Sequence, residues 1–251
     1  MLQLVEVSKR FGGFTAVDRC SYSVVKGQIT CLIGPNGAGK TTSFNLISGL
    51  FRPDFGEIRF KGRRIQGHAP ASIARLGIGR TFQVPRELND ITVLESVKMA
   101  PVNDRFETVF APWFARPSLR RREKELQEQA EATLAEVGLE AKMHTPVRAL
   151  SGGQKKLLEL ARAIAFGAEL IMLDEPTAGV NPALIDELVK LLLRQRDNGL
   201  TFFIVEHNMD FVRAISDHVI VMAEGRTLLD GSFADIRANP DVINAYLGVA
   251  V

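Results

Sequence analysis

The chain has 251 residues, of which 46% are hydrophobic and 24% charged, enough for one domain with subdomains or for two small domains. The formal net charge of only +2 does not call for nucleic acid or an anionic membrane surface as a partner. The N-terminus does not resemble a signal peptide and no apolar stretch has membrane-spanning length, so we expect a soluble protein. The two cysteines do not indicate a disulfide framework, which fits a reducing cytosol.

The N-terminal residues predict an antiparallel β layer. Residues 2–7 alternate apolar and polar side chains as a half-buried strand does, and residues 20–25 do so more loosely. Residues 57–65 indicate a hairpin with a turn near Gly62.

A glycine-rich loop, GPNGAGKTT, lies between an apolar run at 29–33 and a helical run that begins at about Lys40. In this context GxxxxGK[ST] binds phosphate, because the glycines let backbone N–H groups turn toward an anion and the helix start adds its positive dipole end. Lys40 would reach the β- and γ-phosphates of a nucleotide, and the Thr41 hydroxyl would bind Mg²⁺. The predicted nucleotide-binding residues of this loop are Gly34, Pro35, Asn36, Gly37, Ala38, Gly39, Lys40, Thr41 and Thr42.

The stretch from Pro85 to about Arg148 predicts a helical insertion. Residues 102–117 contain Pro112 and Pro117 and follow Pro101, and they predict an irregular loop. An amphipathic helix follows, with an apolar stripe formed by Leu126, Ala130, Leu134 and Val137. The arginine run at 120–122 is typical of a solvated helix start, and a phosphate or partner contact is the alternative.

The segment LSGGQ at 150–154 opens another predicted helix, at 155–166. Ser151 is a good N-cap, and the N–H groups of such a helix start attract an anion. Since the glycine-rich loop already serves one nucleotide, this second helix start is best explained if it faces a nucleotide held by another subunit.

Two carboxylates, Asp174 and Glu175, follow the apolar run at 170–173. In phosphate-loop NTPases a carboxylate at such a strand end holds Mg²⁺, and we assign this role to Asp174. Glu175, one residue further, could act as general base toward the attacking water. The alternative is a pair of solvated loop acids.

Short apolar runs alternate with helical patterns over the rest of the chain, which predicts an α/β fold with a mostly parallel sheet covered on both faces. The predicted strands are 170–173, 201–205, 218–222 and 226–229, and the predicted helices are 182–196, 208–215 and 240–247.

In this order, GPNGAGKTT, Gln83, LSGGQ, LIMLDE and His207 resemble the ATP-binding subunits of ATP-binding cassette (ABC) transporters, with LSGGQ ending twenty residues before Asp174. GRTFQ at 79–83, TAGVNP at 177–182, VEHNM at 205–209 and the terminal YLG at 246–248 look like the LivG-type ATPases of branched-chain amino-acid importers. The resemblance covers essentially the whole chain. It implies a phosphate-loop NTPase (RecA-like) core at 1–84 and 149–251 with the antiparallel β subdomain, and a helical subdomain at 85–148 whose signature helix continues to about 167.

The resemblance also implies roles for single residues. Phe11 would stack on adenine, with Phe14 as second candidate and a core position as the alternative for Phe11. Gln83 would sense Mg²⁺ and the γ-phosphate and link the core to the insertion, and His207 would contact the γ-phosphate. Asn181 stands where the family most often has Asp, so its role between two sites is less defined. The residues expected to act on the partner's nucleotide are Ser151, Gly152, Gly153 and Gln154.

The implied function is that of an ATPase with ATP and Mg²⁺ that powers an amino-acid importer from the cytoplasmic face of the cell membrane, as a peripheral subunit. Its partners would be a second ATP-binding subunit (a second copy or a sister chain), transmembrane permease subunits and, indirectly, a solute-binding protein. Branched-chain amino acids are the leading cargo, while urea, short amides, other amino acids and aromatic acids stay open. The alternatives are a soluble ABC-type ATPase of translation or DNA repair, and a phosphate-loop kinase or GTPase, in which LSGGQ would have no role.

Overall fold

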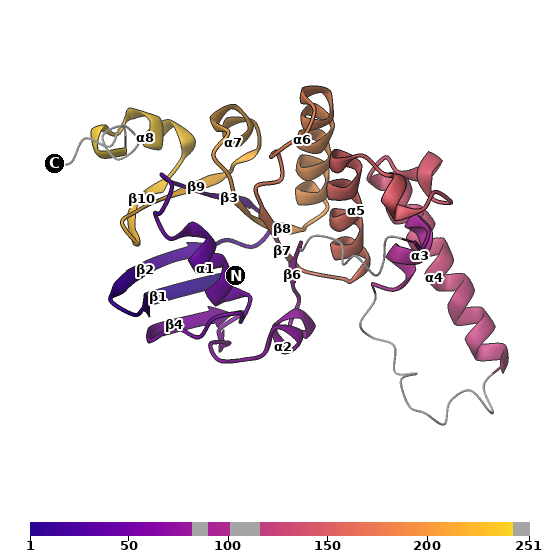
Figure 1. Cartoon of the computed structure of the whole chain (residues 1–251), viewed down its shortest axis with the longest axis horizontal. Coiled ribbons are helices and arrows are strands. Elements are labelled where there is room, and N and C mark those ends of the chain that lie inside the picture. Colours follow the sequence, from indigo (N-terminus) through magenta and orange to yellow (C-terminus); the bar gives the residue numbers. More distant parts are fainter. Residues whose placement is uncertain (82–89, 101–115, 243–251) are drawn as a thin grey trace. The chain divides into compact units, whose positions relative to one another are not determined.

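The computed structural model describes residues 1–81, 90–100 and 116–242, of which residues 116–120 are described by their backbone alone. These residues form two compact units, one made of Met1–Arg80, Glu169–Ala178 and Ile185 onward, the other of Thr81–Ala168 and Gly179–Leu184. Figure 1 labels the elements of both.

The first unit contains an antiparallel four-stranded sheet in the order β2-β1-β4-β5. Its strands are β1 (Leu2–Phe11), β2 (Phe14–Val24), β4 (Phe55–Phe60) and β5 (Arg63–Arg64). The N-terminal antiparallel layer is thus confirmed, although β2 begins six residues earlier than its sequence pattern indicates. β1 and β2 turn at Gly12, whose φ of 58° favours glycine.

A second, six-stranded sheet has the order β10-β9-β3-β8-β7-β6 and is parallel except where β10 joins β9. Its strands are β3 (Ile29–Ile33), β6 (Ile78–Arg80), β7 (Leu170–Asp174), β8 (Thr201–Val205), β9 (His218–Ala223) and β10 (Arg226–Gly231). All five residues of β3 and of β8 are buried, which is why both strands are mostly apolar in the sequence, with Thr30 in β3 and Thr201 in β8 as the exceptions. The mostly parallel sheet is confirmed.

The helices of the first unit are α1 (Lys40–Ile47), α2 (Pro70–Arg75), α7 (Met209–Ile215) and α8 (Phe233–Ala238). Phe44 of α1 packs against Phe203 of β8 with ring centroids 4.9 Å apart, and the hydroxyl of the buried Tyr22 hydrogen-bonds that of Ser43 at 2.5 Å. This packing fixes the helix that follows the glycine-rich loop. The short helix α8 does not stand out in the sequence.

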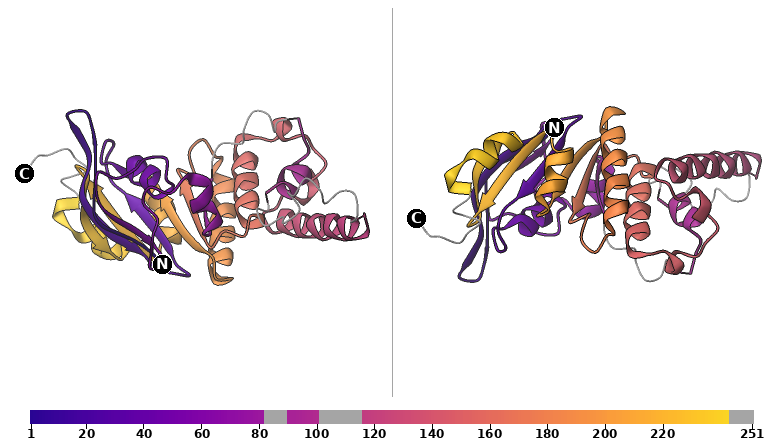
Figure 2. Two further views of the ribbon diagram at one scale, coloured as in Figure 1. Left: turned by 90° about the horizontal axis from the view of Figure 1, so that it is seen from below. Right: turned by 90° about the horizontal axis from the view of Figure 1, so that it is seen from above.

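The second unit is helical. It holds α3 (Val93–Lys98), α4 (Arg116–Glu136), two short 3₁₀ turns (Glu140–Lys142 and Val147–Ala149) and α5 (Gly152–Ala165). Figure 2 shows α4 as one continuous helix, and its predicted stripe buries Ala130, Leu134 and Val137. The last long helix, α6 (Pro182–Asp197), has its first three residues in this unit and the rest in the first unit.

The predicted loop at 102–117 lies outside the described residues up to 115, and α4 begins with Arg116 and Pro117, where proline is tolerated in a first turn. The C-terminal motif at 246–248 also lies outside them. Among the described helices, none combines the length and apolar character needed to cross a bilayer.

Candidate functional site

The glycine-rich loop leaves β3 and enters α1 through backbone geometry that requires glycine at two positions. Gly34 has a φ of 149° and Gly39 a φ of 96°, values that side chains rarely allow. A Cβ atom added to Gly34 would lie 2.0 Å from the carbonyl oxygen of Met222, and one added to Gly39 would lie 2.4 Å from that of Ala16. The loop is therefore held against neighbouring backbone, and no other residue fits these two places.

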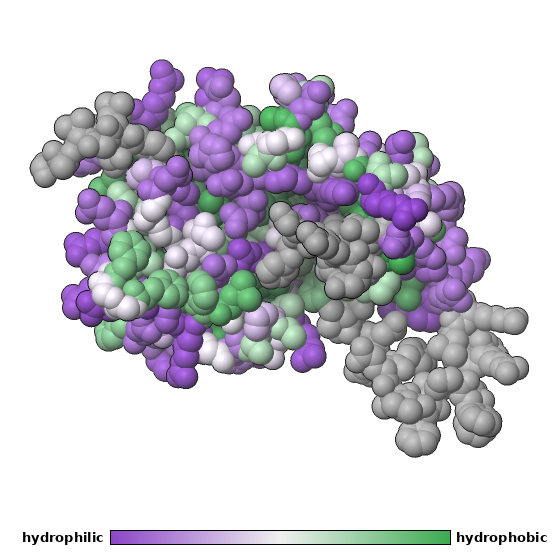
Figure 3. Space-filling model, viewed as in Figure 1, coloured by the Kyte–Doolittle hydropathy of each residue, from purple (hydrophilic) through white to green (hydrophobic). Residues whose placement is uncertain are grey.

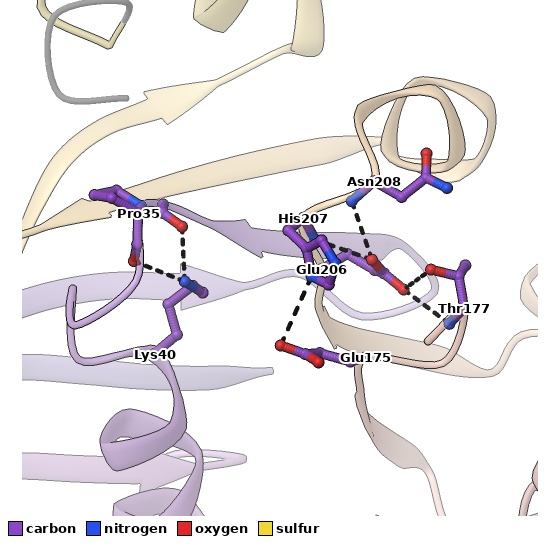
Figure 4. Close-up of polar contacts among 8 residues, drawn as sticks. Pro35, Lys40, Glu175, Thr177, Glu206, His207 and Asn208 are labelled. Atoms are coloured by element: carbon purple, nitrogen blue, oxygen red, sulfur yellow. Dashed lines mark hydrogen bonds and ion pairs between the residues drawn. The ribbon is translucent and has the colours of Figure 1, made fainter. Parts of the chain in front are cut away.

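Lys40, the first residue of α1, is folded back onto this loop. Its Nζ donates hydrogen bonds to the carbonyl oxygens of Gly34 at 2.7 Å and Pro35 at 2.9 Å (Figure 4). Burial lowers the pKa of Lys40, while the negative charges of Glu175 and Asp174 act in the opposite direction. Thr41 is exposed on the first turn of α1. Gly39 precedes the helix and has no side chain to cap it, so the first N–H groups of α1 are suited to an anion.

The two predicted carboxylates differ in setting. Asp174 ends β7, and its Oδ2 lies 3.2 Å from Nη2 of Arg80 at the end of β6. Glu175 follows with a φ of 47°, a left-handed conformation that costs a non-glycine residue about 1–3 kcal/mol. The N–H of Glu175 donates to the carbonyl oxygen of Val205 at 2.9 Å, which holds this unusual turn against β8. Strained backbone of this kind is typical of functional positions.

His207 stands beyond the end of β8, beside Glu175. Its Nδ1 is 3.7 Å from Oε1 of Glu175, longer than a hydrogen bond, and both side chains are about half exposed. Figure 4 shows the two side chains facing each other. Since β3, β8 and β7 are neighbours and parallel, Lys40, His207 and Glu175 all follow the carboxyl ends of adjacent strands, where α/β sheets bind ligands.

Two further residues support this site, and sequence reasoning did not single them out. Nη1 of Arg80 donates to Oδ1 of Asn45 at 2.6 Å and to Oγ of Ser48 at 3.0 Å, so Arg80 joins Asp174 to α1. Glu206, directly before His207, is fully buried. The GRTFQ and VEHNM patterns contain both residues, but neither pattern indicates which way their side chains turn.

The segment LSGGQ begins α5 in the second unit. Oγ of Ser151 accepts the N–H of Gln154 at 3.3 Å, and Oε1 of Gln154 accepts the N–H of Ser151 at 3.0 Å. This capping box confirms the predicted N-cap. Ser151 and Gly152 are exposed, whereas Gly153 is buried against Leu184.

Asn181 lies in the segment Gly179–Leu184 of the same unit, between Val180 and Leu184, whose side chains border Gly153. Its Oδ1 accepts the N–H of Ala183 at 2.9 Å, so the amide caps the first turn of α6. This local bond gives Asn181 a structural use in the chain itself.

Phe11 and Phe14 face each other across the β1–β2 turn and are not core residues. Phe11 is 42% and Phe14 64% exposed, and the Phe11 ring contacts Phe51 edge-on at 5.1 Å. The space-filling view in Figure 3 has a hydrophobic strip over this part of the first unit. The core alternative for Phe11 is therefore wrong, and an exposed ring remains open for stacking. Gln83 lies outside the described residues.

Comparison with family models gives two matches. Residues 17–178 match the model described as ABC transporter, and residues 226–251 match the one described as branched-chain amino acid ATP-binding cassette transporter.

Two relatives are similar over their full length. A probable branched-chain amino acid transport ATP-binding protein of Archaeoglobus fulgidus is 42% identical, over 99% of this chain and 95% of that protein. A high-affinity branched-chain amino acid transport ATP-binding protein of Pseudomonas aeruginosa is 40% identical, over 100% of this chain and 98% of that protein.

Two solved structures are similar as well. A nucleotide-free ATP-binding cassette from an ABC transporter superposes with a TM-score of 0.84 at 34% identity, over 98% of both chains. A cassette of an ABC transporter in its ADP conformation gives a TM-score of 0.84 at 34% identity, over 99% of this chain and 98% of that one.

Proposed function

Because this chain belongs to the ATP-binding proteins of ABC transporters, we propose that its ATPase activity powers the import of branched-chain amino acids. The chain binds and hydrolyses ATP, as this family does. The names of the relatives and the C-terminal family match support the cargo. The permease and solute-binding subunits of the transporter would select it, and this chain would act as a peripheral subunit at the cytoplasmic face of the membrane.

The observation that carries the chemistry is the convergence of Lys40, Glu175 and His207 at the carboxyl ends of β3, β7 and β8. Lys40 would exchange its two carbonyl partners for the β- and γ-phosphates of ATP. Glu175 would take the proton of the attacking water as general base, and His207 would hold the γ-phosphate. An exposed Phe11 would stack on the adenine.

The residues at the site also fit Mg²⁺, which prefers oxygen ligands and keeps several waters. The Thr41 hydroxyl, exposed on the first turn of α1, and the partly exposed Asp174 carboxylate are oxygen donors that would hold the ion, with Gln83 as the further predicted ligand. When bound, Mg²⁺ neutralises charge on the β- and γ-phosphates.

We further propose that a second ATP-binding subunit completes each nucleotide site. The exposed Ser151 and Gly152 at the start of α5 would place N–H groups and a hydroxyl on the γ-phosphate bound to the partner. Losing one such preorganised donor costs roughly 10²–10³ in rate, so a chain without its partner would hydrolyse ATP slowly. The partner would be a second copy or a sister chain.

The experiment that tests the cargo is reconstitution of the chain with its permease and solute-binding subunits in liposomes. Leucine, isoleucine and valine should stimulate ATP hydrolysis several-fold, and the Glu175→Gln transporter should show no stimulation. Stimulation by urea, short amides or aromatic acids but not by the branched-chain amino acids would replace the proposed cargo. Unstimulated ATPase with every solute, in liposomes that contain all subunits, would contradict the importer function.

A further inference from the structure

Glu206 is a buried carboxylate that the proposed chemistry does not use. Its side chain is 0% exposed at the end of β8, directly before His207. Within the described part of the chain, no lysine, arginine or histidine forms an ion pair with it. Burying an ionised carboxylate is costly unless hydrogen bonds compensate, so the partners of Glu206 are informative.

Four hydrogen bonds reach the two oxygens of Glu206 (Figure 4). Oε1 accepts the N–H of Thr177 at 2.9 Å and its hydroxyl at 2.6 Å. Oε2 accepts the N–H of His207 at 2.9 Å and that of Asn208 at 3.2 Å. Each oxygen therefore serves one segment: Oε1 the loop after β7, Oε2 the residues after β8.

All four partners donate hydrogen bonds, so position 206 needs a side chain that accepts hydrogen bonds at both of its terminal atoms. An ionised carboxylate is the only side chain of this shape with acceptors at both ends. A glutamine would turn its NH₂ toward two donors on one side, and an aspartate is one methylene too short to reach both segments. The arrangement thus requires glutamate, although a neutral side chain would avoid the cost of a buried charge.

We infer that Glu206 is the positioning residue that fixes the positions of Glu175 and His207 relative to each other. Thr177 lies two residues after Glu175, so its hydrogen bonds to Glu206 help to hold the left-handed backbone of Glu175. His207 is held directly, because its own N–H binds the Glu206 carboxylate. Oε2 also binds Asn208, whose side chain caps α7 by accepting the N–H of Phe211 at 3.1 Å. The carboxylate therefore ties both strand ends and the start of α7, and sets the 3.7 Å spacing of the His207 and Glu175 side chains. This inference rests on the proposed roles of Glu175 and His207.

The test compares Glu206→Gln with Thr177→Val, which is nearly isosteric and removes only the hydroxyl hydrogen bond. Turnover and KM for ATP are measured at protein concentrations that allow pairing, together with the urea unfolding curve. Because small misplacements of reacting groups can cost on the order of 10²-fold in rate, Glu206→Gln should lower kcat at least about tenfold and Thr177→Val a few-fold. KM for ATP should stay within about twofold in both, since neither residue touches the phosphates.

A second readout separates positioning from mere structural support. The chain has four histidines, so the ring signals in a spectrum of histidine-labelled protein can be assigned by substitution. The His207 signal should shift or broaden in both variants, while that of His218, on β9, stays in place. In a His207→Ala background, Glu206→Gln should slow turnover much less than in the wild-type chain, because the two residues act as a unit.

The outcomes are distinguishable. If His207→Ala and Glu175→Gln keep wild-type turnover, the proposed function of the site fails. If those two lose turnover while Thr177→Val and Glu206→Gln keep kcat and an unshifted His207 signal, only the role of Glu206 is overturned. Fully additive losses of Glu206→Gln and His207→Ala would also overturn it. If Glu206→Gln does not fold, Thr177→Val decides by the same two readouts.

Discussion

Nη2 of Arg80 lies 3.2 Å from Oδ2 of Asp174, and Nη1 of the same guanidinium donates hydrogen bonds to Asn45 on α1 and to Ser48, the C-cap residue of that helix. One cation thus joins the end of β7, where the metal-binding carboxylate is proposed, to the helix that follows the glycine-rich loop. The Arg80 side chain is only 10% exposed, so this network is largely shielded from water.

Arg80→Met should therefore destabilise the protein by about 1–3 kcal/mol, because it leaves Asp174, Asn45 and Ser48 without a shared partner. The matched control is Arg121→Met, which breaks an exposed pair with Glu125 on α4. Exposed pairs of this kind contribute less than about 0.5 kcal/mol. Urea unfolding of both variants measures the difference, and equal midpoints would show that the Arg80 network contributes nothing.

Glu175→Gln should bind ATP and fail to cleave it. Removing a general base costs about 10²–10⁴ in rate, while the amide keeps the shape of the side chain. The measurements are steady-state turnover and the size of the ATP-bound species by gel filtration, where the variant should accumulate as a nucleotide-bound dimer.

Glu224→Gln is the control for Glu175→Gln, since Glu224 also has a left-handed φ, of 49°, and is exposed after β9. Its turnover should equal that of the wild-type chain. Wild-type turnover in Glu175→Gln would reject Glu175 as the base.

Cys20 gives a pH dependence of stability. Burial raises the pKa of its thiol from 9.0 to about 11, with a hydrogen bond to Thr227 acting in the opposite direction. The folded state holds this proton more tightly, so its contribution is complete below pH 9 and is lost as the pH rises toward 11. At about 1.4 kcal/mol for each pKa unit, the free energy of unfolding should fall by about 2–3 kcal/mol from this group.

Cys20→Ser isolates that effect, because serine does not titrate in this range. Between pH 8 and pH 11 the wild-type chain should lose about 2–3 kcal/mol more stability than the variant. Parallel curves for the two proteins would show that the Cys20 proton is not held more tightly by folding.

The parts of the fold that the sequence predicted are those with a strong local pattern. β3 and β8 are buried on both faces and appear as mostly apolar runs in the sequence. Ser151 is a favoured N-cap residue and therefore predicts the start of α5. The helix α8 has a capping box, Ser232 with Asp235, yet Ile236 is its one buried residue, so no apolar stripe marks it.

The residues of the site also fall into those that a local sequence pattern predicts and those that it does not. Lys40, Asp174, Glu175 and His207 each follow a recognisable strand or loop, so a sequence pattern predicts them. Arg80 reaches Asp174 across 94 residues and Glu206 reaches Thr177 across 29, and such pairings arise from sheet order, which no local pattern encodes.

Two subunits are proposed to share each nucleotide site, and an experiment that mixes two variants of this chain tests this sharing most directly. Lys40→Ala removes the phosphate-binding cation of the glycine-rich loop, and Ser151→Arg blocks the LSGGQ segment. Each variant alone should therefore lose at least about 10²-fold in ATPase rate. When the chain pairs with a second copy of itself, random pairing in an equimolar mixture makes half of the dimers mixed, and each mixed dimer has one intact site. The mixture should therefore recover about a quarter of the wild-type rate. If Ser151→Arg alone hydrolysed ATP at the wild-type rate, the sharing of each nucleotide site by two subunits would be contradicted.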